Sequence, residues 1–450
     1  MKNMKRLSLF SLVLLLTSFT MSISQSTMTT AYPILMKQFG INAANVQWVT
    51  SGFMVAMTLV MPLSPWLLDN IPLKKLLNLI VGVFLVGTLY AMVTPNFLGV
   101  VIGRLLEGVA VGALFPTYQA VILENTPKDD RGVAMGTVGL VMGSALAVGP
   151  IVSGIVLQWG SWRILFGLFF IVLLVLIITM QSKIENTHKL EPRNFDFMSA
   201  FLLIGFAGIL YTISVLPATG WNWPLGLILL FSVIFLLTFV VRQLREETPF
   251  LDLRVFKYQG YLPAMLLTGM SYSGLITATV LMPLYFQKVY HLVPVISGLL
   301  MIPAAVFLSS MNPRAGRLLE KIGLRPLVLL GSTMMVLGYV DLAVFGTKYL
   351  LLAIIGAMLL EGGNAFIMMP AVTAANNALP KHLVSHGTAI ITTMRQVIGA
   401  TSILVASILI GVFIKSTSYG AALNHTAAWF ILIPLSGYLL ASRIRVQKQD

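Results

Sequence analysis

Long apolar runs separated by short polar segments make up most of this 450-residue chain. A helix needs ~20 consecutive apolar residues to cross the ~30 Å hydrocarbon core of a membrane. The pattern therefore predicts fourteen membrane-spanning helices in an all-α, polytopic membrane protein. Their predicted ranges are 7–34, 45–67, 76–94, 97–122, 133–157, 163–181, 197–216, 223–241, 261–286, 293–313, 326–345, 349–375, 388–413 and 426–442.

Composition supports this interpretation. The chain is 57% hydrophobic and only 10% charged, whereas soluble domains carry roughly 25% charged residues. A water-soluble globule is therefore excluded. There is no cysteine, which excludes disulfides, thiolate metal sites and a cysteine nucleophile.

The net charge of +14 follows the predicted topology. Most Lys and Arg residues fall in alternate connections, whereas Arg104 and Arg395 fall within predicted spans. The positive-inside rule then predicts that both termini are cytoplasmic, in a cell inner (cytoplasmic) membrane. Because topology accounts for the basic charge, we expect no nucleic-acid partner. The N-terminal apolar run has no small-x-small cleavage site and continues to Pro33, so it predicts a span rather than a signal peptide.

The sequence contains an internal repeat. LLEG occurs at 105–108 and again at 359–362, and a proline follows each glutamate at the same distance. TPKDDRG at 126–132 is echoed by LPKHLVSHG at 379–387, and PWLLDNIPLKK at 65–75 by GRLLEKIGLR at 316–325. The repeat predicts a six-helix bundle at 1–182, two linker helices at 183–258 and a second six-helix bundle at 259–450. Parallel repeats of this kind are typical of transporters whose halves rock about a central site, although a duplicated channel or membrane scaffold is an alternative.

These segments resemble the major facilitator superfamily (MFS), and specifically its 14-span drug:proton antiporter branch. The first loop motif keeps Asp69, Lys74 and Lys75 of the family pattern but has prolines in place of its glycines. The second copy keeps Gly316 and, with Glu320 and Arg325, the same chemistry.

Span five ends in Gly149, Pro150, Ser153 and Gly154, as in the branch's antiporter signature, and FDFMSA at 195–200 and TTMRQVIGA at 392–400 are similar to its seventh and thirteenth spans. One departure is in span one, where Ser24 stands at the position of an aspartate in the branch. The role of that aspartate cannot be carried over.

Two glutamates are expected deep in the membrane. By helix rise, Glu107 lies ~15 Å and Glu361 ~18 Å from the outer ends of their spans. Buried acids in membranes are usually functional or paired. Arg104 precedes Glu107 by three residues, so both share a helix face and can pair, whereas Met358 holds the matching place before Glu361. We therefore expect Glu361 to carry the proton and Glu107 to bind cations, couple or serve as a structural pair; a permanently hydrogen-bonded Glu361 is the alternative.

Two further charged residues have open roles. Asp341 near the outer end of span eleven either takes part in proton coupling or faces water. Arg395 either pairs with Glu361 or anchors the second half through backbone contacts.

Gating is expected from small residues and from the loop motifs. Glycines in span five permit close helix approach, and Pro150 removes a helix hydrogen bond. The acids of the two loop motifs, Asp69 and Glu320, can pair with cations at the cytoplasmic edge in one conformation and release them in another. Tight packing and solvated loops are the alternatives. The candidate gating residues are Asp69, Lys74, Lys75, Gly149, Pro150, Gly154, Gly316, Glu320 and Arg325.

A polar stripe in span one predicts a cavity lining. Ser22, Ser26 and Thr29 recur at helical spacing with Gln25 beside them, so they face either a central cavity or another helix. Methionines such as Met142 and Met368 offer adaptable contacts to apolar ligands.

The predicted function is a proton-coupled antiporter that exports hydrophobic or cationic drugs; the drug class is what the resemblance implies. The alternative is an exporter or flippase of an endogenous lipid, peptide or other amphiphile. We expect a non-enzymatic monomer that contacts membrane lipid and has no cofactor besides the coupling proton. His382 and His386 are spaced as a metal pair, but no third ligand is evident, so no metal is expected. No phosphate-binding loop motif is present, so ATP is not expected to drive transport.

Overall fold

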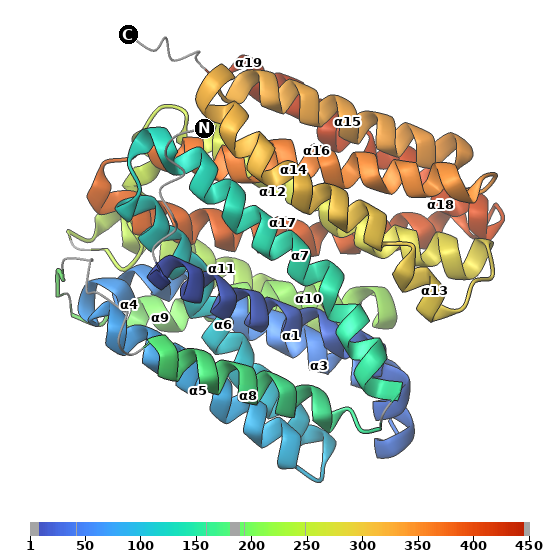
Figure 1. Cartoon of the computed structure of the whole chain (residues 1–450), viewed down its shortest axis with the longest axis horizontal. Coiled ribbons are helices and arrows are strands. Elements are labelled where there is room, and N and C mark those ends of the chain that lie inside the picture. Colours follow the sequence, from blue (N-terminus) through green and yellow to red (C-terminus); the bar gives the residue numbers. More distant parts are fainter. Residues whose placement is uncertain are drawn as a thin grey trace.

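A computed structural model describes residues 9–41, 43–158, 160–180, 190–192, 194–247 and 249–444. Within these ranges the regular elements are all helices, and no strand is present. This confirms the all-α prediction. Figure 1 shows most of the long helices running side by side across the molecule.

The first group of helices spans residues 9 to 180. Asn96 caps α6, because its side chain accepts a hydrogen bond from the backbone N–H of Gly99 at 2.7 Å. Helix α6 packs against α3 and α5, while α1 packs against α7 and α8. The elements are α1 (Leu9–Phe39), α2 (Ala43–Val46), α3 (Trp48–Val60), η1 (Met61–Leu63), α4 (Ser64–Asn70), α5 (Leu73–Val93), α6 (Phe97–Asn125), η2 (Lys128–Asp130), α7 (Arg131–Gln158) and α8 (Arg163–Met180).

The second group follows residue 190 and contains three α-helices and one short 3-10 helix. Helix α10 contacts both α3 and α17, and Trp48 of α3 stacks on Tyr211 of α10 with ring centroids 5.8 Å apart. Helix α11 lies outside α10 and is mostly exposed. The elements are α9 (Phe197–Leu202), α10 (Ile204–Thr219), α11 (Trp223–Arg245) and the short helix η3 (Leu253–Lys257).

The third group runs from residue 261 to residue 442. Helix α16 packs against α12, α14 and α15, and α17 packs against α12 and α18. The elements are α12 (Tyr261–Leu284), η4 (Tyr285–Val289), α13 (Pro294–Leu299), α14 (Ile302–Ile322), α15 (Leu324–Phe345), α16 (Leu350–Asn377), η5 (Lys381–Leu383), α17 (Val384–Phe413), α18 (Tyr419–Phe430) and α19 (Leu432–Ser442).

The first and third groups meet along α7 and α14, α7 and α16, and α6 and α17. In Figure 1 the blue helices α1, α3 and α5 lie in the lower part of the view and the yellow to red helices in the upper part, while the turquoise α7 runs diagonally across both. The repeated LLEG segments lie in α6 and α16, each of which has a proline inside the helix, Pro116 and Pro370.

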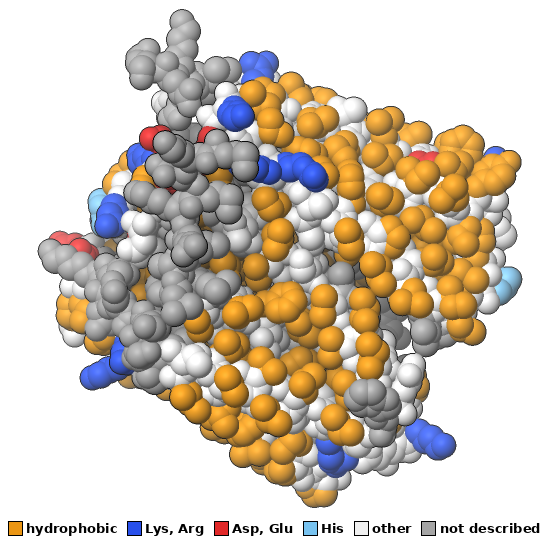
Figure 2. Space-filling view, viewed as in Figure 1, with side chains coloured by type: hydrophobic (Ala, Val, Ile, Leu, Met, Phe, Trp, Pro, Cys, Tyr) orange, Lys and Arg blue, Asp and Glu red, His pale blue; other side chains and the backbone are white. Residues whose placement is uncertain are grey.

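Ten helices among the described residues are long and apolar enough to cross a membrane. Their bounds are Trp48–Asn70, Leu73–Val93, Phe97–Asn125, Trp223–Arg245, Tyr261–Val289, Ile296–Ile322, Leu324–Phe345, Leu350–Asn377, Lys381–Phe413 and Tyr419–Ser442. Two shorter apolar helices cover Arg163–Thr179 and Phe197–Ile213. The predicted count of fourteen is therefore not confirmed. Figure 2 shows the broad apolar surface that such helices present to lipid, with basic side chains toward its edges.

The structure corrects two predicted loops. The motif segments lie within helices, because Asp69 is in α4 and both Gly316 and Glu320 are in α14. Leu, Glu, Lys and Arg are good helix formers, and α14 ends only at Gly323, whose φ of 77° suits glycine. His386 also lies in a helix, since α17 begins at Val384.

Candidate functional site

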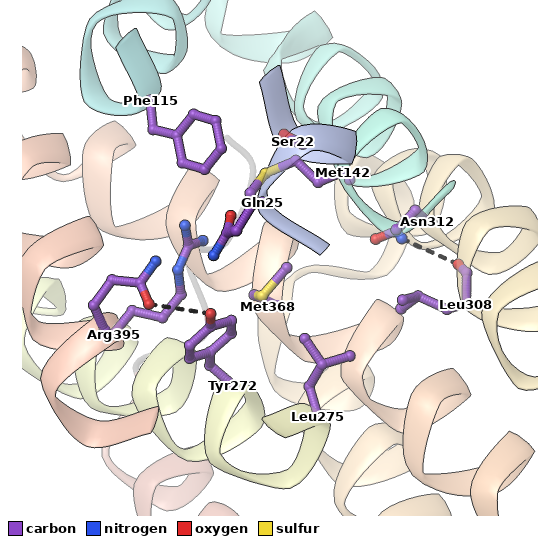
Figure 3. Close-up of a pocket in the computed structure, with 13 residues that line it drawn as sticks. Ser22, Gln25, Phe115, Met142, Tyr272, Leu275, Leu308, Asn312, Met368 and Arg395 are labelled. Carbon is purple, nitrogen blue, oxygen red and sulfur yellow. Dashed lines mark hydrogen bonds between the residues drawn. The ribbon is translucent and has the colours of Figure 1, made fainter. Parts of the chain in front are cut away.

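A cavity lies between the first and third groups of helices. Its enclosed volume in this conformation is about 40 Å³, and it is contributed by α1, α6 and α7 on one side and α12, α14, α16 and α17 on the other. Figure 3 shows the side chains that converge on it. The lining residues are Ser22, Gln25, Phe115, Gly139, Met142, Gly143, Tyr272, Leu275, Leu308, Asn312, Met368, Arg395 and Gln396.

The lining is mostly apolar with a polar cluster on one side. The hydroxyl of Tyr272 donates to Oε1 of Gln396 at 3.1 Å, and the guanidinium of Arg395 lies over the Tyr272 ring, 5.3 Å from its centroid. Figure 3 shows that guanidinium beside Gln25, with Phe115 above it. The cavity thus combines an apolar body with a few converging polar groups, as small-molecule sites do.

The polar stripe of α1 divides between two surroundings. Ser22 and Gln25 line the cavity, as do Met142 and Met368 from α7 and α16. The hydroxyl of Ser26 instead bonds the backbone oxygen of Ala145 in α7 at 3.4 Å. The side chain of Thr29 lies outside the described residues. Both surroundings that the sequence allows are therefore present.

Arg104 and Glu107 form a fully buried ion pair in α6. Nη1 of Arg104 lies 2.5 Å from Oε2 of Glu107, and both side chains are 0% exposed. The other carboxylate oxygen accepts a hydrogen bond from Thr88 at 2.7 Å, and Nε of Arg104 donates to the carbonyl of Val49 at 3.1 Å. Arg104 also lies over the ring of Phe53. Four helices, α1, α3, α5 and α6, therefore meet at this pair, because Ser24 of α1 bonds both of its members.

Glu361 has different surroundings at the corresponding place in α16. Its side chain is buried, with the residue only 4% exposed, and Oε2 has no hydrogen-bond partner among the described residues. None of the ion pairs within the described part of the chain includes Glu361. It lies outside the cavity lining.

The structure places Arg395 away from an ion pair with Glu361. Its residue is 1% exposed, and within the described residues neither Nε nor Nη1 has a hydrogen-bond partner. Anchoring through backbone contacts by these two nitrogens is likewise absent from the described part of the chain. Arg395 instead contributes its charge to the cavity lining.

Asp341 is half-buried between α15 and α16. Its Oδ2 has no hydrogen-bond partner among the described residues. A Cβ atom placed on Gly356 of α16 would lie 2.7 Å from this oxygen, so the glycine makes room for the carboxylate.

The second motif copy contacts the first turn of α7. Oε1 of Glu320 accepts the backbone N–H of Val133 at 3.0 Å, which satisfies a donor that a helix start leaves free. The backbones of Gly132 and Gly316 touch here, since a Cβ on Gly316 would lie 2.1 Å from the Gly132 oxygen. This contact joins α7 to α14 at one end of both helices.

The first motif copy makes a similar contact with α17. Oδ2 of Asp69 lies 4.0 Å from Nε2 of the buried His386, whose Nδ1 accepts the backbone N–H of Asp252 at 3.1 Å. Nearby, Nη1 of Arg131 donates to the side chain of Asn377 at 2.8 Å.

The other candidate gating residues lie as follows. Lys74 is half-buried and Lys75 exposed at the start of α5, and Arg325 is exposed at the start of α15. Gly149 packs tightly on Ser26, whereas a Cβ on Gly154 would meet nothing within 4 Å. The side chain of Pro150 lies outside the described residues.

Sequence reasoning missed several residues of these sites. His386 was assigned to a loop as part of a metal-spaced pair, yet it bridges three elements; no group of three or more metal-binding side chains occurs in the described ranges. Tyr272, Gln396 and Asn312 line the cavity, and only tertiary packing brings them there. The position of Gln396 directly after Arg395 was the one available signal.

Comparison with known proteins identifies the family. Residues 14–403 match the family described as Major Facilitator Superfamily. The chain is 35% identical over 405 residues to "Uncharacterized MFS-type transporter YhcA" of Bacillus subtilis, covering 89% of this chain and 76% of that protein. It is 32% identical over 396 residues to "Lincomycin resistance protein LmrB" of Listeria monocytogenes, covering 87% and 84% respectively. The solved proton:xylose symporter XylE superposes with a TM-score of 0.69 at 14% identity, covering 96% of this chain and 94% of that one. The chain therefore belongs to the Major Facilitator Superfamily of membrane transporters.

Proposed function

We propose that this protein is a proton-coupled antiporter that exports hydrophobic compounds by alternating access. The observation that carries the proposal is Glu361, a buried carboxyl group that has, among the described residues, an unpartnered oxygen and no ion-pair partner. An ionised carboxylate without a partner is costly in a low-dielectric interior. Glu361 therefore holds a proton in this conformation and releases it when the second conformation admits water or a cation.

Glu107 has a supporting role in this proposal. Its carboxylate accepts hydrogen bonds from Arg104, Thr88 and Ser24, so it stays ionised and holds four helices together. Exchange of a proton at Glu107 would leave Arg104 buried without a counter-ion, which is strongly unfavourable. The two glutamates thus have different roles: Glu107 forms a permanent ion pair in α6, and Glu361 carries an exchangeable proton in α16.

The contacts at one end of the helices support alternating access. Glu320 with Val133 and Asp69 with His386 join the first and third groups at two related places. Breaking them would let the groups separate at that end, which the distribution of basic residues assigns to the cytoplasm. Such contacts bias an equilibrium between two conformations.

The proposal includes the 14-span topology of the antiporter branch. The long helices α1 and α7, of 31 and 28 residues, together with the two shorter apolar helices, support four spans beyond the ten. We propose bundles at 1–182 and 259–450, linker helices at 183–258, cytoplasmic termini and a monomer in the cell inner membrane.

The substrate class is proposed from the cavity. Its apolar residues suit a hydrophobic compound, and the name of LmrB, lincomycin resistance, is consistent with export of drugs. The sequence-based expectation included cationic drugs. Because the single charged side chain in the described lining is Arg395, we restrict the proposal to hydrophobic compounds.

Transport in inside-out membrane vesicles tests the proposal. With an acidic lumen, wild-type protein is expected to accumulate at least one of three probes of matched shape: 1-pyrenebutyrate, 1-pyrenebutyramide and 1-pyrenebutylamine. Glu361→Gln should abolish gradient-driven accumulation but keep exchange of labelled for unlabelled probe, since glutamine mimics the protonated acid.

The exposed Glu247 provides the matched control. Glu247→Gln removes a carboxylate of the same type and should accumulate the probe at the wild-type rate. Gradient-driven accumulation that persists in Glu361→Gln would reject the role of Glu361. Wild-type vesicles that accumulate none of the three probes would reject export of hydrophobic compounds.

A further inference from the structure

Arg395 places a positive charge in the cavity. Of the 13 described residues that line the cavity, Arg395 alone is charged. It lies in α17, twelfth in the helix that begins at Val384, and its residue is 1% exposed. The charge cannot be removed by deprotonation, because arginine stays protonated in proteins.

The described residues leave this charge without a counter-ion. None of the ion pairs in the described ranges includes Arg395, and its Nε and Nη1 lack hydrogen-bond partners. Its described electrostatic neighbours are two uncharged phenols, the Tyr272 ring beneath the guanidinium and Tyr118. Leaving two buried donors of a charged group unpaired is unfavourable. The other buried arginine, Arg104, differs in this respect, because Glu107 neutralises its charge at 2.5 Å.

The groups around Arg395 form an ordered binding site. The Tyr272 hydroxyl is used by Gln396, which fixes the ring beneath the guanidinium. Gln25 lies beside the guanidinium in Figure 3 and supplies further hydrogen-bonding capacity from α1. Apolar side chains of Phe115, Leu275 and Met368 surround this polar cluster. A ligand with one polar end and an apolar body would satisfy both surfaces.

We propose that the cavity binds hydrophobic compounds that carry an anionic group, a carboxylate, sulfonate or phosphate, with Arg395 as the counter-ion. The guanidinium donates charge-assisted hydrogen bonds to the anionic oxygens through the nitrogens that now lack partners. The apolar body of the compound packs against Phe115 and the methionines. This inference rests on the proposed function and names its substrate class.

Binding to the purified full-length protein tests the inference. The probes are 1-pyrenebutyrate, its uncharged amide and 1-pyrenebutylamine, in nanodiscs of phosphatidylcholine, with empty nanodiscs subtracted. Energy transfer from the tryptophans to pyrene reports the dissociation constant. We expect the butyrate to bind about tenfold or more tightly than the amide, as a charge-assisted hydrogen bond predicts, and the amine to bind weakest.

Three variants assign the effect to Arg395. Arg395→Gln should remove the preference for butyrate over amide, and Arg395→Lys should keep part of it because lysine retains the charge. Arg314→Gln removes an exposed arginine of α14 and should keep the full preference. Equal binding of butyrate and amide by the wild-type protein, or tighter binding of the amine, would overturn the inference even if no arginine variant folds.

Anionic lipid is a second source of the same chemistry. Nanodiscs containing phosphatidylglycerol distinguish it from a soluble compound. If lipid headgroups occupy the site, this lipid should weaken butyrate binding to the wild-type protein but leave binding to Arg395→Gln unchanged; if soluble anions do, the preference should persist at equal strength. Either result supports an anion site.

The outcome is separable from that of the proposed function. Binding is measured without a proton gradient and does not require Glu361. Equal binding of the three probes combined with Glu361-dependent accumulation would reject the anion site and keep the antiporter. A preference for butyrate without gradient-driven accumulation would reject the antiporter and keep the site.

Discussion

The hydroxyl of Ser24 donates a hydrogen bond to Oε2 of Glu107 at 3.3 Å, although the two residues lie in different helices. The same hydroxyl accepts from Nη1 of Arg104 at 3.0 Å. By the sequence resemblance, Ser24 stands at the position where the 14-span antiporter branch often has aspartate. An acid at this position would therefore compete with Glu107 for one arginine.

Ser24→Asp is expected to destabilise the protein in a pH-dependent way. Two carboxylates would share one buried guanidinium, and like charges at this distance cannot both stay ionised. The thermal unfolding midpoint should fall more at pH 8 than at pH 5.5, where the extra acid takes up a proton. Ser24→Asn, of similar size and uncharged, should show no such pH dependence; an equal loss at both pH values in Ser24→Asp would contradict this account.

Removing one member of the buried pair should cost more than removing both. Arg104→Gln or Glu107→Gln leaves an uncompensated buried charge and should lower the free energy of unfolding by about 3–5 kcal/mol. The double variant leaves neutral side chains that can hydrogen-bond to each other. Chemical denaturation should show the double variant to be less destabilised than either single variant, and a double variant as unstable as the sum of the two would argue against the pair.

Gly316→Ala is expected to open the contact between α7 and α14. The new Cβ would lie 2.1 Å from the Gly132 oxygen, so the helices must separate and the Glu320 contact must lengthen. The chain has no cysteine, so spin labels can be attached at Asp129→Cys, next to α7, and at Lys321→Cys, an exposed position of α14, without other changes. Electron–electron distance measurements should show a longer distance in the alanine variant.

Gly411→Ala is the matched control for that experiment. It adds the same methyl group within a helix, α17, where no atom lies within 4 Å of the new Cβ. The label distance should then equal that of the unmodified protein. If Gly316→Ala gave the same distance as this control, the glycine contact would not hold the two helices together.

Asp196 links α9 to α11 outside the membrane-spanning segments. Burial raises the pKa of Asp196, but the hydrogen bonds that Arg242 and Ser199 donate outweigh it, so the pKa lies below its usual range. A lowered pKa stabilises the folded state above the unfolded value of about 4 and loses that effect as the pH falls further.

Asp196→Asn should therefore lower the unfolding midpoint at neutral pH. The free energy of unfolding is expected to fall by about 1 kcal/mol, because asparagine can keep the cap on the Ser199 N–H but loses the charge-assisted hydrogen bonds from Arg242. The difference from wild type should stay constant from pH 8 to about 4 and narrow below that pH. A difference that widened in acid would contradict the sign of this linkage.

Much of the fold could be predicted from hydrophobic patterning, since helices such as α6 and α8 begin at the predicted residues 97 and 163. The predicted helix boundaries were wrong where a capping residue sets the start of a helix. Helix α18 begins at Tyr419 rather than 426, because Ser418 caps it by accepting the Ala421 N–H. Polar residues near that end lower the local hydropathy, so the hydropathy pattern does not show where the helix begins.

The candidate site could be predicted only in part. The i,i+3 spacing correctly indicated the contact between Arg104 and Glu107 because it depends on one helix alone. The cavity lining of α12 and α14, and the contact of Asp69 with His386, depend on how distant helices pack. No local spacing encodes such contacts.

The segment LLEG appears in α6 and in α16, and the residue three places before each acid differs, Arg104 in one and Met358 in the other. In the proposed mechanism, that single side chain decides which copy carries a permanent charge and which carries an exchangeable proton. Under the same mechanism, a one-residue exchange would be enough to move the titrating acid from one half of the protein to the other.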